Sequence, residues 1–174
     1  MTASPATQTV TKPAATWLWG VALAALALRF WIGATFPITG DEAYFYWWGR
    51  QPEWGYYDHP PMAGWWIALM LQVFGDSTLS MRLPAVVLPL AVGGLLGWGV
   101  AAIDRQRAPW VVLLFWLAPI HWLNALITTD TPLIFWSVAS AAVLMHAQAQ
   151  QDADAPSRTV IGWHACSGLF LGLA

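Results

Sequence analysis

Two neighbouring carboxylates are the side chains of this sequence best suited to acid–base chemistry. Asp41 and Glu42 follow Thr39 and Gly40 and open a segment whose aromatic residues recur with helical spacing. One interpretation is structural, because an acidic residue at the start of a helix caps free backbone N–H groups and suits the helix dipole. The other is catalytic, because a carboxylate near a low-dielectric boundary can take a proton from a hydroxyl group. Residue types alone leave both interpretations open.

A second polar cluster lies about fifteen residues further on, where Tyr57, Asp58 and His59 precede two prolines. The prolines fix the turn and start a short helix. Asp58 and His59 could simply cap that helix, or they could bind a divalent cation or a phosphate group. Tyr57 ends an aromatic run that suits a membrane interface, and the same run could stack against sugar rings.

Three further charged residues adjoin or interrupt apolar segments. Arg82 could pair with Asp76, extend to the interface, or hold a phosphate group with its planar guanidinium. Asp130 is expected to be the N-cap of a helix that starts at Thr131, where an anion could also bind if a cation intervened. Arg29 lies inside an apolar segment, so it must face other helices or a polar cavity.

The elements that must position these residues are membrane helices. Of 174 residues, 58% are hydrophobic and only 9% are charged, against roughly 25% charged in soluble domains. Fourteen Trp residues suit the membrane–water interface. A net charge of -2 offers no basic surface for nucleic acid, and the single Cys166 excludes an internal disulfide. The composition therefore predicts an all-α integral membrane protein, a multi-spanning helical bundle in contact with membrane lipids.

Hydropathy divides the chain into a tail, a first span, a polar loop and several further spans. Residues 1–16 predict a disordered cytoplasmic tail, residues 17–36 a first transmembrane helix, and residues 37–83 an external loop with juxtamembrane helices. Residues 84–174 predict further transmembrane helices, at 84–103, 110–127, 131–147 and 160–174. The last of these is short of a full span, so we expect an N-terminal part of a longer protein that is inactive by itself.

The short apolar segment 60–74 decides which residues share a side of the membrane. It is shorter than the roughly 17 to 25 residues that cross a bilayer. If it does not cross, Lys12, Arg105, Arg107 and Arg158 lie on one side, as the positive-inside rule requires. The candidate residues then share the non-cytoplasmic face: Asp41, Glu42, Asp58, His59, Arg82 and Asp130. If it crosses, Arg105, Arg107 and Arg158 lie outside; we prefer the first topology.

Four motifs in order resemble the lipid-linked-sugar glycosyltransferases of family 39, the protein O-mannosyltransferase and aminoarabinose transferase type. The motifs are Gly40–Tyr44, Tyr56–Met62, Gly75–Ser77 with Arg82–Pro84, and Thr129–Leu133. The resemblance implies a C-type glycosyltransferase fold, a polyprenyl-phosphate sugar donor and an acceptor hydroxyl on a lipid, glycan or protein. The resemblance makes Asp41 the catalytic base, with Glu42 beside it. We expect the substrate to be bound by Tyr57, Asp58, His59, Arg82 and Asp130.

One departure from that family concerns the second motif. The aminoarabinose transferase branch has Glu-Lys-Pro-Pro where this chain has Asp58, His59, Pro60 and Pro61, so His59 replaces the Lys that contacts the lipid phosphate. No cofactor is certain, and a divalent cation at Asp58 and His59 is the one option. The resemblance implies a bacterial inner-membrane enzyme with a periplasmic site, acting in protein glycosylation or lipid A modification. The alternative is a non-catalytic membrane subunit that binds or transports a carrier lipid.

Overall fold

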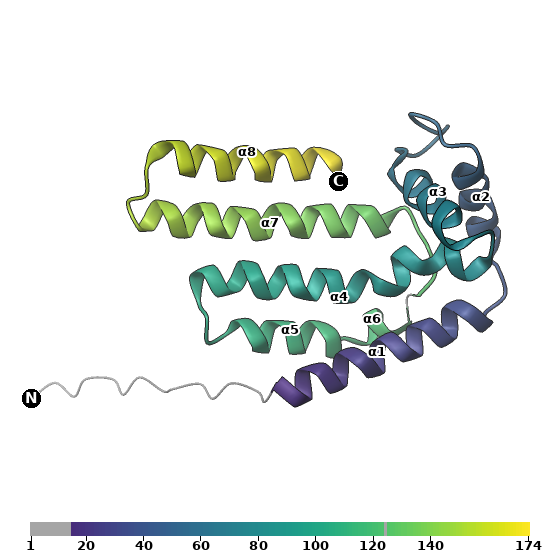
Figure 1. Ribbon diagram of the computed structural model, residues 1–174, viewed down its shortest axis with the longest axis horizontal. Coiled ribbons are helices and arrows are strands. Elements are labelled where there is room, and N and C mark those ends of the chain that lie inside the picture. The colour runs from purple at the N-terminus through teal and green to yellow at the C-terminus, as the bar shows by residue number, and fades with distance from the viewer. Residues whose placement is uncertain (1–14, 124) are drawn as a thin grey trace, which may run out of the picture.

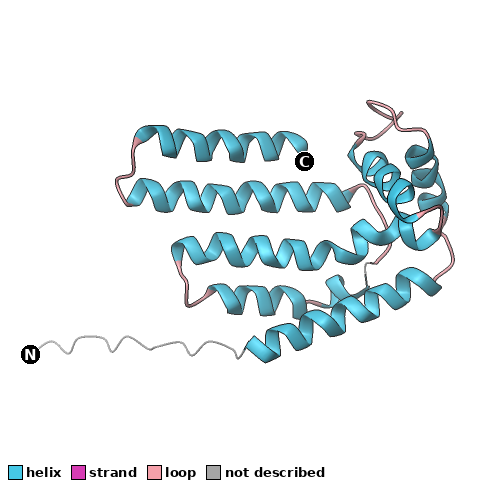
Figure 2. Cartoon of the chain, viewed as in Figure 1, coloured by secondary structure: helices cyan, strands magenta, loops and turns pink. Residues whose placement is uncertain are grey.

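A computed structural model of the chain describes residues 15–123 and 125–174, and within them every regular element is a helix (Figure 2). In chain order the helices are α1 (Ala15–Thr35), α2 (Gly40–Arg50), α3 (Met62–Phe74), α4 (Thr78–Ile103), α5 (Ala108–Leu117), α6 (Pro119–Leu123), α7 (Asp130–Asp152) and α8 (Ser157–Leu173). The predicted all-α fold class is confirmed. Most of the expected tail at 1–16, and Asn124, lie outside the described residues.

The long helices lie alongside one another, and α2 and α3 gather at one end of them (Figure 1). Helix α4 is central, since it contacts α1, α3, α5 and α7, and α8 packs against α7. The turns that join α4 to α5 and α7 to α8 lie at the opposite end. The fold therefore separates a set of long helices from one cap built of two short helices and several connections.

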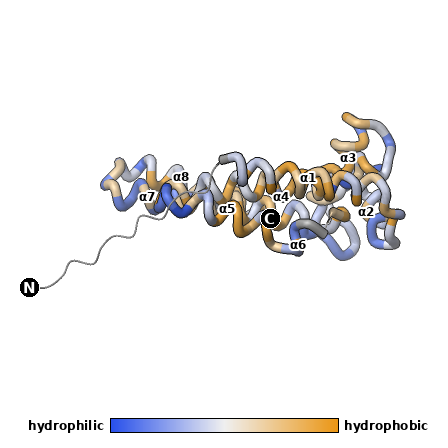
Figure 3. Tube along the Cα trace, turned by 90° about the horizontal axis from the view of Figure 1, so that it is seen from below, coloured by the Kyte–Doolittle hydropathy of each residue, from blue (hydrophilic) through white to orange (hydrophobic). Residues whose placement is uncertain are grey.

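Three of the described helices are long and apolar enough to cross a membrane: residues Thr16–Thr35, Thr78–Ile103 and Asp130–Asp152. Hydrophilic residues gather toward the two ends of the molecule, and apolar residues dominate the long helices between them (Figure 3). Much of that apolar surface is exposed in the isolated chain, as at Leu23, Leu114 and Leu144. Such a surface is stable in hydrocarbon, so the chain is a helical membrane protein.

The short helix α3 does not run alongside the long helices for a full span. It has 13 residues and packs against α2 at the capped end of the bundle. Gly49 allows this contact, because a Cβ there would lie 2.2 Å from Cγ2 of Ile67. Phe45, Trp48, Ile67 and Leu71 form the core of the cap.

Helix α4 begins earlier than the expected start at residue 84. Ser77 is its N-cap, and its hydroxyl accepts a hydrogen bond of 3.1 Å from the amide of Ser80. The helix then runs through both Pro84 and Pro89. Proline suits the first turn of a helix, which explains why the sequence favoured a start at Pro84; the Ser77 cap adds almost two turns before it.

The expected continuous helix over 110–127 is wrong, because the structure divides this segment. Helix α5 ends at Leu117, Ala118 is extended, and the short α6 begins at Pro119. Proline lacks an N–H group and pushes the residue before it out of the helical region, so Ala118 breaks the helix. The connection 118–129 then returns the chain toward the capped end and leads into α7.

Close packing between α4 and α5 depends on two glycines of α4 that are four residues apart. A Cβ at Gly93 would lie 2.3 Å from the indole nitrogen of Trp116, and one at Gly97 would lie 2.8 Å from Val112. The Trp116 indole donates a hydrogen bond of 2.8 Å to the carbonyl oxygen of Pro89. The four-residue spacing of glycines therefore marks the face on which α5 approaches α4.

Candidate functional site at the capped end

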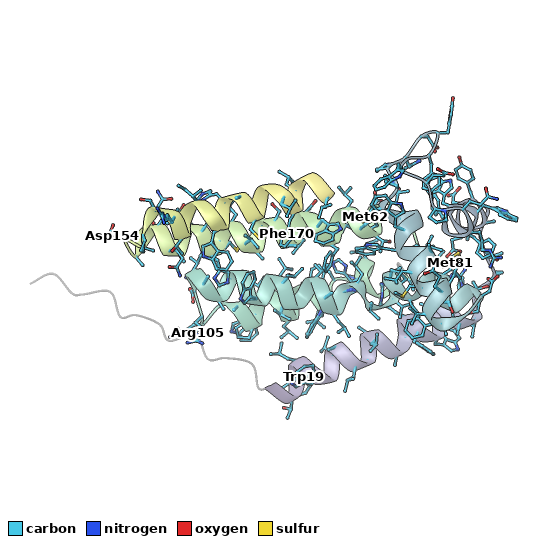
Figure 4. The ribbon with its side chains drawn as sticks, turned by 45° about the horizontal axis from the view of Figure 1, so that its top comes forward. Trp19, Met62, Met81, Arg105, Asp154 and Phe170 are labelled. Carbon is cyan, nitrogen blue, oxygen red and sulfur yellow. The ribbon has the colours of Figure 1, made fainter. Side chains whose placement is uncertain are left out.

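The predicted site residues come from four elements, and all four meet at the capped end. Asp41 and Glu42 lie in α2, Asp58 and His59 in the connection to α3, Arg82 in the second turn of α4, and Asp130 at the start of α7. Figure 4 labels Met62 and Met81 at this end, with Arg105 and Asp154 at the other. The fold thus places together residues that are up to 89 positions apart in the chain.

Helix α2 begins with a capping box in which Thr39, and not Asp41, is the N-cap. The Thr39 hydroxyl accepts a hydrogen bond of 3.3 Å from the Glu42 amide, and the Glu42 carboxylate accepts one of 3.1 Å from the Thr39 amide. The capping interpretation of Asp41 is therefore wrong, since the chain caps this helix two residues earlier. The cap leaves the Asp41 side chain unused and turns Glu42 inward.

Glu42 forms a buried ion pair with Arg82. Its side chain is 1% exposed, and Arg82 is 0% exposed. The guanidinium binds the carboxylate in a bidentate manner, with Nε donating to Oε1 at 2.7 Å and Nη2 donating to Oε2 at 2.6 Å. The Ile127 amide adds a hydrogen bond of 3.4 Å to Oε1. The pair therefore joins α2, α4 and the connection before α7.

Arg82 uses all five of its N–H donors within the protein. Besides Glu42 it donates to the carbonyl oxygens of Gly33 at 3.0 Å, Phe36 at 2.8 Å and Pro37 at 2.9 Å. In this arrangement it offers no donor to a phosphate group. The geometry instead gives Arg82 a positioning role, because it fixes the end of α1 and the carboxylate of Glu42 in one place.

Pairing with Asp76, one of the three alternatives for Arg82, is not found in the structure. Asp76 accepts a hydrogen bond of 2.8 Å from Arg50 and two from the Tyr46 hydroxyl, at 2.8 and 3.0 Å. This exposed contact links α2 to the turn between α3 and α4. Sequence distance favoured Asp76 for Arg82, whereas α4 carries Arg82 inward, away from that turn.

The Arg82 contact changes the acidity of Glu42. Burial alone would raise the pKa of the carboxyl group, but hydrogen bonds from Arg82, Thr39 and Ile127 and the charge of Arg82 oppose it, so the pKa lies below the ordinary value of 4.5. Glu42 is therefore a carboxylate at neutral pH, and its oxygens are already occupied by donors. A group of this kind is suited to holding a structure together and not to accepting a proton.

Asp41 differs from Glu42 both in its exposure and in its bonded partners. Its side chain is exposed, and among the described residues it has no hydrogen-bond or ion-pair partner. Successive helical residues point about 100° apart, so the buried position of Glu42 directs Asp41 outward from the α2 surface. A free carboxylate on an anchored helix is what a general base requires.

Asp58 and His59 form a contact pair beside the core of the cap. Nδ1 of His59 lies 2.9 Å from Oδ1 of Asp58, and the ring lies against Trp48 and Phe45 at centroid distances of 5.5 and 6.4 Å. The ring is thus held by aromatic packing. Tyr57 points into solvent with a relative exposure of 99%, so it makes no contribution to this packing.

The metal interpretation has two candidate ligands in the structure. Among residues 15–123 and 125–174 no group of three or more His, Cys, Asp or Glu side chains is placed to hold a metal ion. Asp58 and His59 alone would leave most coordination positions to other donors, such as phosphate oxygens or water. A divalent cation here stays a prediction.

Asp130 is the first residue of α7, and its side chain is exposed. The predicted N-cap is one residue too late, because Thr129 occupies that position, without a side-chain cap bond. The turn is stabilised instead by Thr131, whose hydroxyl accepts a hydrogen bond of 3.3 Å from the Thr128 amide. The Asp130 carboxylate is therefore free of a capping duty.

Two contributors to the site escaped the sequence reasoning. The Ile127 amide is a backbone donor, and no side-chain pattern reveals its bond to Glu42. Tyr46 belongs to the aromatic run that ends at Tyr57, and its hydroxyl donates to the Asp76 carboxylate. Its position four residues before Arg50 was an available signal, since residues i and i+4 share a helix face.

A family model described as dolichyl-phosphate-mannose-protein mannosyltransferase matches residues 58–174 of the chain. The match covers more than half of the sequence. The chain belongs to this family. No curated protein and no solved structure matches it.

Membership of the mannosyltransferase family makes the chain, at the coarse level, a glycosyltransferase of the lipid-linked-sugar type. The matched residues include Asp58, His59, Arg82 and Asp130 but begin after Asp41 and Glu42. The structure joins the two parts, because Arg82 and Ile127 of the matched region both bind Glu42. Helix α2 is thereby an integral part of the same site.

Proposed function

We propose that this protein transfers a sugar from a polyprenyl-phosphate donor to an acceptor hydroxyl, with Asp41 as the general base. The observation that carries the proposal is the contrast between the two carboxylates of α2: Glu42 is locked to Arg82, and Asp41 is exposed and unpaired among the described residues. The family match supports the class of reaction. A hexose, mannose, is the donor sugar that the family description favours.

In the proposed reaction the acceptor hydroxyl oxygen attacks the anomeric carbon of the donor. The bond between that carbon and the phosphate oxygen breaks, and the lipid phosphate departs with the electron pair. Asp41 takes the hydroxyl proton as the new bond forms. Phosphate is a stable leaving group, so one base and cationic stabilisation of the departing charge suffice.

The remaining predicted residues have supporting roles in this proposal. Asp58 and His59 lie on the loop beside α2, where His59 can donate to a phosphate oxygen and Asp58 can hold a cation next to it. Asp130 supplies a second free carboxylate at the same end. Tyr57 is free to stack against a sugar ring. We infer that the site lies on the periplasmic face of a bacterial inner membrane.

Replacing Asp41 by Asn tests the proposal, because the change removes a base and nearly keeps the shape. The intact protein in membranes is given polyprenyl-phosphate mannose and a peptide rich in Ser and Thr, and mannose transfer is measured. We expect transfer to fall by about 100-fold or more, as for loss of a general base. Glu53→Gln is the matched control, since Glu53 is an exposed carboxylate on the same cap, and it should transfer normally.

The alternative function, a non-catalytic subunit that binds a carrier lipid, predicts another result. Such a protein would show no transfer before or after the substitution. If the unaltered protein transfers mannose and Asp41→Asn keeps its rate within a few-fold, Asp41 is not the base. Binding of the donor, measured separately, should be retained in the Asn variant if its fold is intact.

A further inference from the structure

A second buried arginine of the bundle is Arg29, which lies in the apolar helix α1. Its side chain is 2% exposed, in agreement with the expectation that it faces other helices. Among the described residues no carboxylate lies within ion-pair distance of it. A charge in such a segment needs other partners, because an unpartnered charge is strongly unfavourable inside a membrane.

The partners of Arg29 are backbone carbonyl groups of two other helices. Nη2 donates to the carbonyl oxygen of Ala85, and Nε donates to that of Val86 at 3.2 Å. Nη1 donates to the carbonyl oxygen of His121 in α6. The guanidinium thereby connects α1 to both α4 and α6.

The bond to Ala85 has a specific cause in the sequence. In a helix the carbonyl of Ala85 would accept a bond from the amide of residue 89, which is proline and has no N–H group. Arg29 supplies the missing donor. Arg82 serves α1 in a different way, since it donates to the carbonyl oxygen of Gly33 in the last turn of α1, where carbonyls have no intrahelical donor. Arg29 therefore fills a proline gap inside α4, and Arg82 caps the end of α1.

The bond to His121 links this arrangement to the candidate site. Helix α6 opens the connection that returns the chain to the capped end, where the Ile127 amide binds Glu42 and α7 begins with Asp130. The His121 ring also packs on Phe115 of α5, with a centroid distance of 3.9 Å. The carbonyl bond from Arg29 fixes this connection against α1.

We propose that Arg29 is a positioning residue of the transferase site: by holding the His121 carbonyl it keeps the Ile127 amide on Glu42 and sets the place of Asp130. The chemical meaning of this role rests on the proposed function, whereas the positioning itself is measurable without any activity. Arg29 has two separable duties, one toward the Pro89 gap in α4 and one toward α6. That separation makes the proposal testable.

Two substitutions distinguish the duties. Arg29→Met removes both sets of bonds while keeping an apolar side chain of similar length. Adding Pro89→Ala restores an amide at position 89, so α4 can satisfy the Ala85 carbonyl itself. Pro89→Ala alone and Arg105→Met, which alters an exposed arginine, are the controls. Amide hydrogen exchange is measured by peptide for residues 85–93 and 118–129 in the intact protein in detergent, together with the thermal midpoint.

We expect Arg29→Met to speed exchange in both peptides by about tenfold or more, because Ala85, Val86 and His121 lose the guanidinium and the Ile127 amide loses its fixed place on Glu42. The double variant should recover protection in 85–93 and most of the thermal midpoint, while 118–129 stays fast. The proposal is overturned if 118–129 keeps its protection in Arg29→Met, or if it recovers together with 85–93. Should Arg29→Met fail to fold, the double variant and Arg29→Lys give the same comparison.

Mannose transfer is recorded on the same variants as a separate readout. In a working enzyme Arg29→Met and the double variant should both lose kcat, with the KM for the donor lipid nearly unchanged, because the donor does not contact Arg29. If the unaltered protein transfers no mannose but the exchange pattern holds, the proposed function fails and the positioning role stands. If the variants transfer mannose normally and the exchange pattern is absent, the proposed function stands and the positioning role of Arg29 fails.

Discussion

At the scale of single residues, the central feature is that two adjacent carboxylates have opposite environments. Glu42 is buried, carries a bidentate arginine and accepts a backbone amide, whereas Asp41 has none of these partners among the described residues. The capping box at Thr39 sets the helical phase that separates them. One helix start thus produces both a buried anchor and an exposed carboxylate.

The ion pair predicts an acid sensitivity that belongs to Glu42. Because the pKa of Glu42 in the folded protein lies below its ordinary value of 4.5, the folded state binds fewer protons than the unfolded chain in that range. The stabilisation is complete above the ordinary value and is lost as the pH falls through the folded value. Thermal midpoints measured from about pH 6 down to about pH 3 should therefore fall steeply in the unaltered protein.

Glu42→Gln should remove much of that slope and lower stability at neutral pH. The neutral amide leaves the Arg82 charge buried without a counter-ion, a change that costs about 3 to 5 kcal/mol when one partner of a buried pair is removed. Glu53→Gln, on the exposed loop, should leave both the slope and the neutral midpoint nearly unchanged. An unchanged slope in Glu42→Gln would show that other carboxylates govern the acid response.

Residue types revealed the candidates but not their roles. The sequence singled out Asp41, Glu42, Asp58, His59, Arg82 and Asp130, and all lie at one end of the bundle. It could not reveal that Arg82 donates all its hydrogen bonds to Glu42 and three carbonyl oxygens, because those partners lie 40 to 49 positions away. Contacts of that range depend on helix packing, which a local pattern does not encode.

At the scale of elements, the prolines explain most differences between expectation and structure. Pro84 and Pro89 lie inside α4, where Arg29 satisfies the carbonyl that Pro89 leaves without a donor. At Pro119 the helix breaks instead, since Ala118 is extended and its amide donates to the Phe115 carbonyl oxygen at 3.2 Å. The same residue type therefore lies inside one helix and ends another, and in α4 the missing donor comes from a residue that is distant in sequence.

The contact between α4 and α5 yields a matched pair of predictions from adjacent glycines. Gly93→Ala should destabilise the protein by about 1 to 3 kcal/mol, because its Cβ would meet the Trp116 ring at 2.3 Å. Gly94→Ala meets nothing within 4 Å and should be neutral or stabilising by up to about 1 kcal/mol, from helix propensity. Thermal midpoints in detergent measure both, and equal midpoints would mean that α5 does not pack here.

At the scale of the whole molecule, charge is distributed unequally between the two ends. At the capped end Arg82 is paired with Glu42 and Arg50 with Asp76. At the other end Arg105 and Arg158 form no ion pair among the described residues, and Arg107 contacts Asp104 at 3.2 Å. Short loops that carry more Arg and Lys favour the cytoplasmic side of a membrane, and this end has Arg105, Arg107 and Arg158, so the capped end is expected to face outward.

Labelling of single cysteines tests this orientation and the unity of the site together. In a Cys166→Ser background, cysteines are placed singly at Glu53 and Thr129 on the capped end and at Gln106 and Asp154 on the other. Intact cells are treated with a membrane-impermeant thiol reagent. Glu53 and Thr129 are chosen because neither belongs to the buried ion pair, which a cysteine at Glu42 would break.

The expected result is that the cysteines at Glu53 and Thr129 react in intact cells, while those at Gln106 and Asp154 react only after the cells are opened. This pattern follows because α3 packs on α2 without spanning the bundle, so the chain returns to the same side before α4. Labelling of all four from outside would show that the chain is not inserted as a bundle. Labelling of Glu53 without Thr129 would place the bilayer between Asp41 and Asp130, and these two carboxylates could not then serve one sugar transfer.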